Sequence, residues 1–225
     1  MPFLEIACFT PASVLLAAGA GADRIEFCAD ASVGGITPSL ADFQQLRRQT
    51  NIPIYVMIRP RGGSFVYAGS ELAQMARDLV AFREAGADGF VLGILGRDGG
   101  VDVAECTPLV QLAGEKSCTF HRAFDAIVEE KMPAAVKDVA ACGFKSILTS
   151  GGKPTAAAGS DVLRRLVVEA RDQGMQVIVG GGVRSNVLAD LQNQTDAVWY
   201  HSSAVTDGGL VADENEVKAL KAILG

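Results

Sequence analysis

Three side chains suited to acid–base or anion chemistry stand within five residues: His121, Arg122 and Asp125. They lie at the carboxyl end of a β-prone run, Cys118–His121. A strand buried on both faces cannot carry such groups in its middle, because an unpaired buried charge costs several kcal/mol or shifts its pKa until it is neutral. A strand end that opens into a pocket can carry them. The stretch therefore indicates a functional site, and its alternative is a capped strand end with a surface ion pair.

Short apolar runs and helical stretches alternate along the chain, and these are the elements that must position the polar groups. Eight runs are expected to be strands: Phe3–Cys8, Arg24–Cys28, Ile54–Ile58, Gly89–Leu92, Cys118–His121, Ser146–Thr149, Gln176–Val179 and Ala197–His201. Helical stretches are expected near 10–18, 39–49, 70–85, 103–113, 133–141, 160–173, 186–193 and from 215 onward. Strict alternation of this kind predicts right-handed βαβ units and a parallel sheet.

The repeat length distinguishes the two common parallel architectures. The 225 residues divide into eight units of about 28 residues, with no linker and no second composition regime. No Gly-x-Gly-x-x-Gly follows the first strand, which disfavours a dinucleotide-binding, doubly wound sheet. We therefore predict an α/β fold with a single domain over residues 1–225, a closed (β/α)8 TIM barrel with parallel strands.

A barrel gives the polar strand residues a common location, because chemistry in such folds lies at the mouth formed by the carboxyl ends of the strands. Strand side chains alternate between two faces, and the outer face lies under apolar helices, so charged residues should point inward. This places Glu5, Glu26, Arg59 and His121 inside. Such neighbours perturb one another's pKa values, which suits acid–base work; a salt-bridge layer that only fills the lumen is an equal alternative. The catalytic candidates are Glu26, Arg59, His121 and Asp125.

A glycine run after the seventh strand indicates a second kind of site. Residues without side chains let backbone N–H groups approach an anion closely, and the following helix start near Asn186 adds a favourable dipole. Phosphate sites in these barrels frequently lie at the loops after strands seven and eight. The alternative is a tight turn that needs positive φ. The residues expected to bind an anionic substrate are Arg61, Arg122, Thr149, Ser150, Gly180, Gly181, Gly182, His201 and Ser202.

Two of the cysteines, Cys8 and Cys28, close adjacent strands, so their sulfurs could approach one soft ion. Two thiolates suit Cu(I), which prefers soft ligands. Alternation opposes this pairing, since Cys28 shares the face of Glu26 whereas Cys8 should point away from the face of Glu5. The alternative is that Cys8 is a small hydrophobic residue of the barrel wall. The other three cysteines, Cys106, Cys118 and Cys142, are interpreted as packing residues.

These segments resemble the CutC family, named as copper homeostasis proteins, over about residues 4–203. The resemblance rests on Leu4–Cys8, Asp23–Cys28, Gly34–Ser39, Val56–Gly63 with Phe65 and Tyr67, Gly86–Leu95, Thr119–Asp125, Ile147–Gly151 and Gly180–Val183. It implies a single barrel, a cytosolic setting and a Cu(I) site whose cysteine pair matches Cys8 and Cys28. Phe27 stands where the family commonly has leucine.

Composition excludes several classes of function. A net charge of −6 leaves no basic footprint, which argues against nucleic acid or an anionic membrane as a partner. No apolar run approaches the roughly 20 residues of a membrane span, and no cationic segment precedes the small apolar stretch Val14–Ala22. Five cysteines without an export signal indicate reduced thiols and a cytoplasmic location.

Two functions from different classes follow. In the first, the protein binds or traffics Cu(I) through Cys8 and Cys28. In the second, it is a lyase, isomerase or hydrolase that acts on a small anionic or phosphorylated substrate at the barrel mouth. The apolar loop residues Phe65–Tyr67 would meet solvent in a monomer, so we also expect a homodimer or a higher homo-oligomer.

Overall fold

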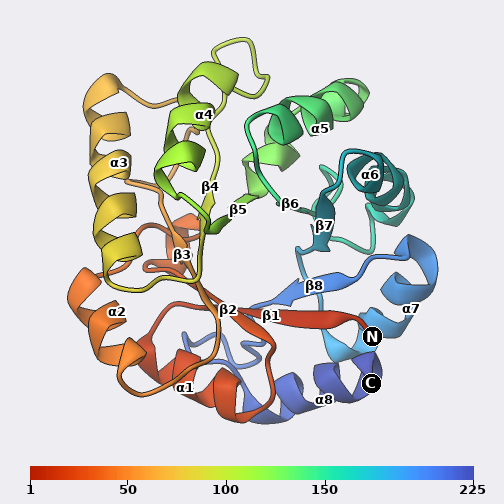
Figure 1. The fold of residues 1–225 in the computed structure, drawn as a ribbon. Helices are drawn as coiled ribbons and strands as arrows, with labels where there is room; N and C mark the ends of the chain where they lie inside the picture. The colour runs from red at the N-terminus through yellow and green to blue at the C-terminus, as the bar shows by residue number, and fades with distance from the viewer.

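The structure, a computed structural model, describes residues 1–225. Eight parallel strands close into one barrel in chain order, and a ring of helices surrounds them (Figure 1). The strands are β1 (Phe3–Cys8), β2 (Arg24–Phe27), β3 (Ile54–Met57), β4 (Gly89–Leu92), β5 (Ser117–Phe120), β6 (Ser146–Thr149), β7 (Gln176–Val179) and β8 (Trp199–Ser202). The predicted (β/α)8 barrel is confirmed.

Eight α-helices cover the outside of the barrel. They are α1 (Pro11–Gly19), α2 (Leu40–Arg47), α3 (Gly69–Glu84), α4 (Val103–Leu112), α5 (Met132–Ala141), α6 (Ser160–Asp172), α7 (Ser185–Thr195) and α8 (Glu214–Leu224). Short 3-10 turns at Ala31–Val33, Arg122–Ala126 and Glu129–Lys131 belong to the loops after β2 and β5. None of the helices combines the length and the apolar character needed to cross a membrane.

Local sequence explains where the helices begin and turn back. Thr10 caps α1, since its hydroxyl accepts the N–H of Ser13 at 3.2 Å, and Pro11 occupies the first turn where no N–H donor is needed. After α3 and α5 the chain reverses through Gly86 and Gly143, with φ of 92° and 96°. That left-handed conformation favours glycine, and it returns the chain along the sheet.

Closure of the barrel joins the first strand to the last. In the pairing of β1 with β8, Phe3 lies opposite Trp199 and Glu5 lies opposite His201. The side chains of Leu4 and Ile6 face outward into a continuous core of 55 buried residues between barrel and helices. The opposite face of each strand lines the lumen, which leaves Glu5 and its inward neighbours inside.

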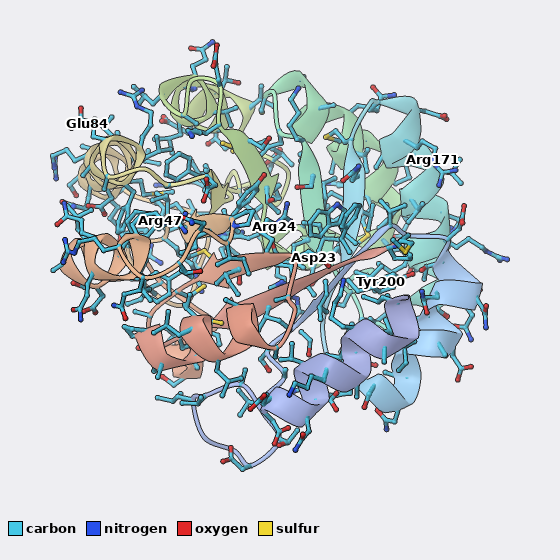
Figure 2. All side chains as sticks on the ribbon, turned by 60° about the horizontal axis from the view of Figure 1, so that its bottom comes forward. Asp23, Arg24, Arg47, Glu84, Arg171 and Tyr200 are labelled. Carbon is cyan, nitrogen blue, oxygen red and sulfur yellow. The ribbon has the colours of Figure 1, made fainter.

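The amino-terminal end of the lumen is filled by one arginine and three rings. The guanidinium of Arg24 lies 4.1 Å from the ring centroid of Tyr55 and 4.0 Å from that of Trp199, and Phe3 stacks on Trp199 at 4.8 Å. Figure 2 shows Arg24 toward the middle of the barrel, whereas Glu84 and Arg171 lie on the outer helices. This layer supports the polar groups above it.

Candidate active site at the barrel mouth

The carboxyl ends of the strands surround a cavity of about 240 Å³. Its lining includes acidic and imidazole side chains from β2 and β8, and basic and imidazole side chains from the loops that follow β3, β5 and β7. The lining residues are Ala7, Phe9, Glu26, Gly34, Met57, Arg59, Phe65, His121, Arg122, Leu148, Gly181, Gly182, Arg184, His201, Ser202 and Ser203. The cavity therefore lies at the carboxyl ends of the strands, where the sequence predicts a site.

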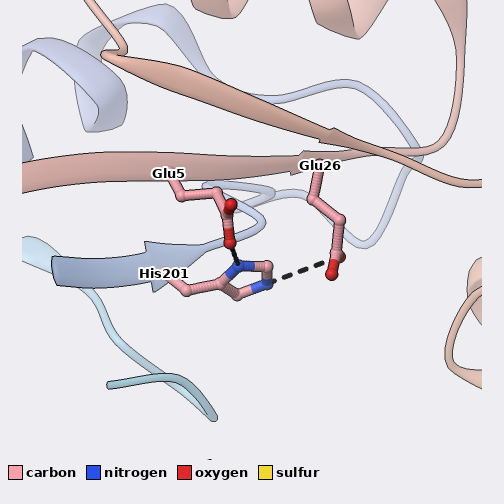
Figure 3. A group of neighbouring side chains, drawn as sticks. All are labelled: Glu5, Glu26 and His201. Carbon is pink, nitrogen blue, oxygen red and sulfur yellow. Dashed lines mark hydrogen bonds and ion pairs between the residues drawn. The ribbon is translucent and has the colours of Figure 1, made fainter. Parts of the chain in front are cut away.

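Three buried titratable side chains, Glu5, His201 and Glu26, lie in a row (Figure 3). The last two of them line the cavity. Glu5 of β1 contacts Nδ1 of His201 on β8 through Oε1, at 2.8 Å. Nε2 of the same ring lies 3.8 Å from Oε2 of Glu26 on β2. The strand register brings these groups together, since Glu5 pairs with His201 and the residue after the next, Ala7, pairs with Glu26.

Burial and neighbouring charges set the protonation states of Glu5, His201 and Glu26. Burial alone would raise the pKa of Glu5, but Arg24 and His201 outweigh it and lower that pKa to about 2. Burial raises the pKa of Glu26, and the neighbouring Glu5 carboxylate raises it further. Burial would lower the pKa of His201, but Glu26 and Glu5 outweigh burial and raise it. Glu5 therefore stays ionised and orients the ring, while a proton can rest on either His201 or Glu26.

Glu5, Glu26 and His201 are also a group that could hold a cation, since one ligand atom from each lies within 4.8 Å of the others. Both oxygens of Glu5 are already engaged, one by His201 and the other by Nε of Arg24 at 2.6 Å. A cation would have to displace that buried ion pair. Arg24 and a proton on His201 supply the positive charge that the two carboxylates require, so the geometry favours a proton-transfer site.

His121 lies at the end of β5 in a different protonation state. Its Nδ1 accepts the N–H of Ala123 at 3.2 Å, whereas its Nε2 is buried without a partner. Burial, aided by the positive charge of Arg59, lowers the pKa of His121 to about 3. The ring packs against Phe65 with centroids 5.0 Å apart. His121 is therefore a neutral imidazole that carries its hydrogen on Nε2.

Arg59 and Arg61, both predicted to act on a substrate, have different surroundings. Arg59 donates to the carbonyls of Val33, Gly35 and Gly63, so it ties the loops after β2 and β3 together, and its Nε remains buried without a partner. Arg61 binds Glu71 and three loop carbonyls, and it does not line the cavity. Arg59 stays in the candidate site; Arg61 organises the loop before α3.

The loops after β7 and β8 form a cationic end of the cavity. The N–H groups of Gly181 and Gly182 donate to no acceptor in the protein. Arg184, which reasoning from the sequence missed, donates to the hydroxyls of Ser202 and Ser203 at 2.8 and 3.1 Å. The same two Nη atoms also donate to the carbonyls of Val183 and Val205. Backbone donors beside a guanidinium are the groups that bind phosphate or carboxylate. Arg184 directly follows the Gly180–Val183 segment. Its position just after a glycine run at the barrel mouth is the sequence feature that could have identified it as a site residue.

The glycines at this end leave no room for side chains. A Cβ on Gly181 would lie 2.9 Å from Cβ of Ser150 and 3.4 Å from Nη2 of Arg122, and one on Gly180 would lie 2.6 Å from Leu148. Gly181 also has φ of 101°. The glycine run is thus a tight turn and also a set of N–H donors, so the two alternatives considered from the sequence are compatible.

Asp125, a predicted catalytic residue, and the predicted anion-binding residues Thr149 and Ser150 support the mouth from behind. Asp125 accepts the hydroxyl of Thr149 and the N–H groups of Ser150 and Gly152, and it pairs with Arg122 at 2.7 Å. Asp125, Thr149 and Ser150 do not line the cavity, although Arg122 does. Asp125 therefore fixes the loop after β6 and orients Arg122.

The start of α7 does not provide the open dipole expected from the sequence. Glu216 of α8 accepts the N–H of Ser185 at 2.8 Å and the hydroxyl of the same residue at 2.8 Å. A carboxylate therefore occupies the positive end of this helix, so anion binding must rely on the glycines and arginines.

The cysteine pair leaves the strand ends in different directions. Cys8 belongs to the outer core, and burial raises its pKa to about 12. Cys28 packs with Met57 and Val91, and its Sγ lies 3.5 Å from Oε2 of Glu26. Burial and then Glu26 raise the pKa of the Cys28 thiol. The two side chains pack in separate clusters, which does not fit a preformed two-thiolate copper site.

A single closed barrel with a polar, cationic mouth places the chain among the (β/α)8 barrel proteins. The CutC family profile matches residues 3–206, so the chain belongs to the CutC family. It is 41% identical over 206 residues to a CutC family protein of Salmonella enteritidis and 37% identical over 206 residues to one of Yersinia pestis. Each match covers 91% of this chain, and 80% and 79% of those relatives, respectively.

Solved structures agree with this assignment. A CutC protein of Streptococcus agalactiae, whose name associates it with copper homeostasis, has a TM-score of 0.86 and 28% identity, with 92% of this chain and all of that chain covered. Phosphoribosyl anthranilate isomerase of Thermotoga maritima has a TM-score of 0.66 at 13% identity, covering 100% and 98%. The second similarity concerns the barrel fold alone.

Proposed function

We propose that the protein is an enzyme that transfers a proton on a small anionic substrate at the barrel mouth. The observation that carries this proposal is the chain from Glu5 through His201 to Glu26, which ends in the cavity. General acid–base catalysis needs a group whose pKa lies near the working pH, and the raised pKa values of Glu26 and His201 move toward that condition.

The roles follow from the contacts. Glu5 holds Nδ1–H of His201, so Nε2 remains available on the side of Glu26. Oε1 of Glu26 is buried and has no partner, which suits it to receive a substrate proton. The anionic group of the substrate binds Gly181, Gly182 and Arg184 at the other end of the cavity.

Isotope exchange tests the proposal for any substrate of this class, whatever product it forms. Pools of sugar phosphates and small carboxylic acids are incubated with the protein in D2O, and replacement of C–H by C–D is followed by NMR. We expect exchange in one member of the pool, and Glu26→Gln should slow it by about 10²–10⁴-fold. Glu84→Gln, on the exposed side of α3, is the matched control and should leave the rate unchanged. Absence of exchange and of binding across the pools would contradict the proposal.

Copper binding is the second candidate, and the name of the Streptococcus agalactiae protein favours it. Cys28 donates its backbone N–H to the carbonyl of Cys8 at 2.9 Å, so the two residues are neighbours. Because their side chains diverge, Cu(I) binding would require Cys8 to leave the outer core. Competition titrations on Cys8→Ser and Cys28→Ser test this function, and unchanged affinity in both variants would remove it.

Two further properties remain proposals. A cytoplasmic location is supported by five free cysteines, all buried. A homodimer or higher homo-oligomer now has less support from Phe65 and Tyr67, because Phe65 packs on His121 and Tyr67 lies under Arg61. Light scattering at micromolar concentration tests the oligomeric state, and a monomer mass would overturn it.

A further inference from the structure

We infer that the mouth is built for a substrate with a carbonyl group, and that Nε2–H of His121 together with Nε–H of Arg59 binds the carbonyl oxygen. This inference rests on the proposed function and adds the class of substrate and the reacting oxygen. The substrate is a small aldehyde, ketone or keto acid that also carries a phosphate or carboxylate group.

The starting observation is a set of buried polar atoms without partners. The protein contains five such side-chain atoms, and three of them belong to residues that line the mouth: Oε1 of Glu26, Nε of Arg59 and Nε2 of His121. One is an acceptor and two are donors. Unpaired buried polar groups are costly, and they are retained where a ligand supplies the partner. The cavity therefore fits a ligand with an acidic C–H or O–H beside Glu26 and an acceptor oxygen beside Arg59 and His121.

The orientation of His121 is fixed on every side. Its Nδ1 is occupied by the N–H of Ala123, so the hydrogen of the neutral ring must reside on Nε2. A Cβ on Gly93 would lie 2.6 Å from Nδ1, so the ring lies directly against the backbone after β4. Phe65 packs on the ring and on the guanidinium of Arg59, with the latter 4.8 Å from its centroid. One aromatic side chain thus holds both donors in place.

The lowered pKa of His121 agrees with this role. A neutral imidazole donates a hydrogen bond to an oxygen that gains negative charge without releasing its proton, which is an established use of histidine beside a carboxylate base. Protonation of His121 beside Arg59 would place two positive charges together, so the ring is kept as a donor and not as a general acid.

The step that follows is an enolisation. Oε1 of Glu26, ionised in the reacting state, removes a proton from the carbon next to the carbonyl, and the C–H bond breaks. Its electron pair forms the carbon–carbon double bond, and the carbonyl π pair moves to the oxygen. Nε2–H of His121 and Nε–H of Arg59 bind the resulting enolate oxygen. The proton on Glu26 then returns to the same carbon, the electron pair on the oxygen re-forms the carbonyl π bond, and no redox partner is required.

Calorimetric binding of two probes tests the inference: inorganic phosphate, which occupies only the anion end, and phosphoglycolohydroxamate, a planar mimic of a phosphorylated enediolate. Wild type should bind the hydroxamate at least about 100-fold more tightly than phosphate, as expected of an intermediate analogue. His121→Phe should lose about 10- to 100-fold of hydroxamate affinity, equivalent to one hydrogen bond to a charged oxygen, and should keep phosphate affinity. His121→Gln, whose amide N–H can replace Nε2–H, should recover part of the loss.

The two probes distinguish failure of the carbonyl inference from failure of the proposed function. If phosphate binds but the hydroxamate binds no more tightly, or if His121→Phe changes neither probe, the carbonyl inference is overturned and the anion site stands. If neither probe binds wild type, the proposed function fails with it. Should His121→Phe not fold, 15N NMR of wild type decides, because the protein has only two histidines. Nε2–H of His121 must stay protonated and neutral near pH 7 and must shift on hydroxamate binding; an unshifted resonance overturns the inference.

Discussion

The two histidines of this protein occupy opposite kinds of environment within one cavity. Both are buried, at 3% exposure for His121 and 9% for His201. On the β8 side, Glu26 and Glu5 raise the pKa of His201 although burial opposes it. On the β5 side, burial and Arg59 lower the pKa of His121 to about 3. Burial acts in the same direction on both rings, so the charge of the neighbours decides whether an imidazole carries a proton or only donates a hydrogen bond.

The largest expected effect is on the pH dependence of stability. In the folded protein the pKa of His121 is about 3, whereas its ordinary value is 6.5. The neutral, buried ring therefore contributes to the free energy of unfolding fully above pH 6.5. This contribution is lost as the pH falls toward 3, by about 5 kcal/mol at most. His201, with its raised pKa, contributes stability below 6.5 that is lost as pH rises through its folded pKa. Urea unfolding of His121→Phe between pH 7 and 4 should show weaker acid sensitivity than wild type. If the two proteins lose stability equally on acidification, the pKa of His121 is not lowered and the two histidines do not differ in this way.

Glu5→Gln should make His201 on the β8 side more like His121 on the β5 side, with a lower pKa. The change leaves Arg24 buried without its carboxylate partner, and breaking such a pair costs about 3–5 kcal/mol. It also removes one of the two carboxylates that raise the pKa of His201, so this pKa should fall in NMR titrations. Glu84→Gln serves as the control for stability. An unchanged His201 titration would show that Glu26 alone sets its charge.

Arg184→Met should affect only the anion end. Loss of a hydrogen bond to a charged group is worth about 1.5–3 kcal/mol, which corresponds to about 10- to 100-fold weaker phosphate binding. The NMR tautomer signal of His121 should not change, because the hydrogen bonds of Arg184 go to Val183, Ser202, Ser203 and Val205 and not to the β5 side. Isothermal titration with phosphate measures the effect, and undiminished affinity would place the anion elsewhere.

Cys28→Ala should give the smallest change. Its thiol lies 3.5 Å from Oε2 of Glu26 and lowers the pKa of that carboxyl group slightly against the effect of burial. A thiol is a weak donor, so removing this hydrogen bond should cost less than about 1 kcal/mol and should change the proton-exchange rate by less than about fivefold. The pH–rate profile should shift toward higher pH. A loss as large as that of Glu26→Gln would instead give the thiol a direct role.

The fold was predictable because its signals are local and repeated. Alternating apolar runs and helices define a parallel barrel, and the parity of strand positions sends Glu5, Glu26 and His121 inward. The charge states were not predictable in the same way. His201 depends on Glu5, which is 196 positions distant in sequence, and only the closed barrel makes them neighbours.

Hydrogen-bond partners from loops account for the remaining differences. Arg61 resembles an anion ligand in the sequence, yet the carbonyls and the Glu71 carboxylate that occupy it cannot be recognised from residue types. The same holds for the start of α7, which Glu216 caps from 31 positions away. Polar residues at strand ends thus indicate where a site lies, but the structure is needed to separate the groups that face a ligand from those that hold the loops.

The pairing of Glu5 with His201 across the seam between β1 and β8 has a consequence for biosynthesis. A ribosome synthesises the Glu5 carboxylate 196 positions before the imidazole that contacts it. A chain that has not yet formed β8 therefore cannot bring Glu5, Glu26 and His201 together. If the protein has the proposed function, proton transfer would therefore begin only after β8 has docked against β1.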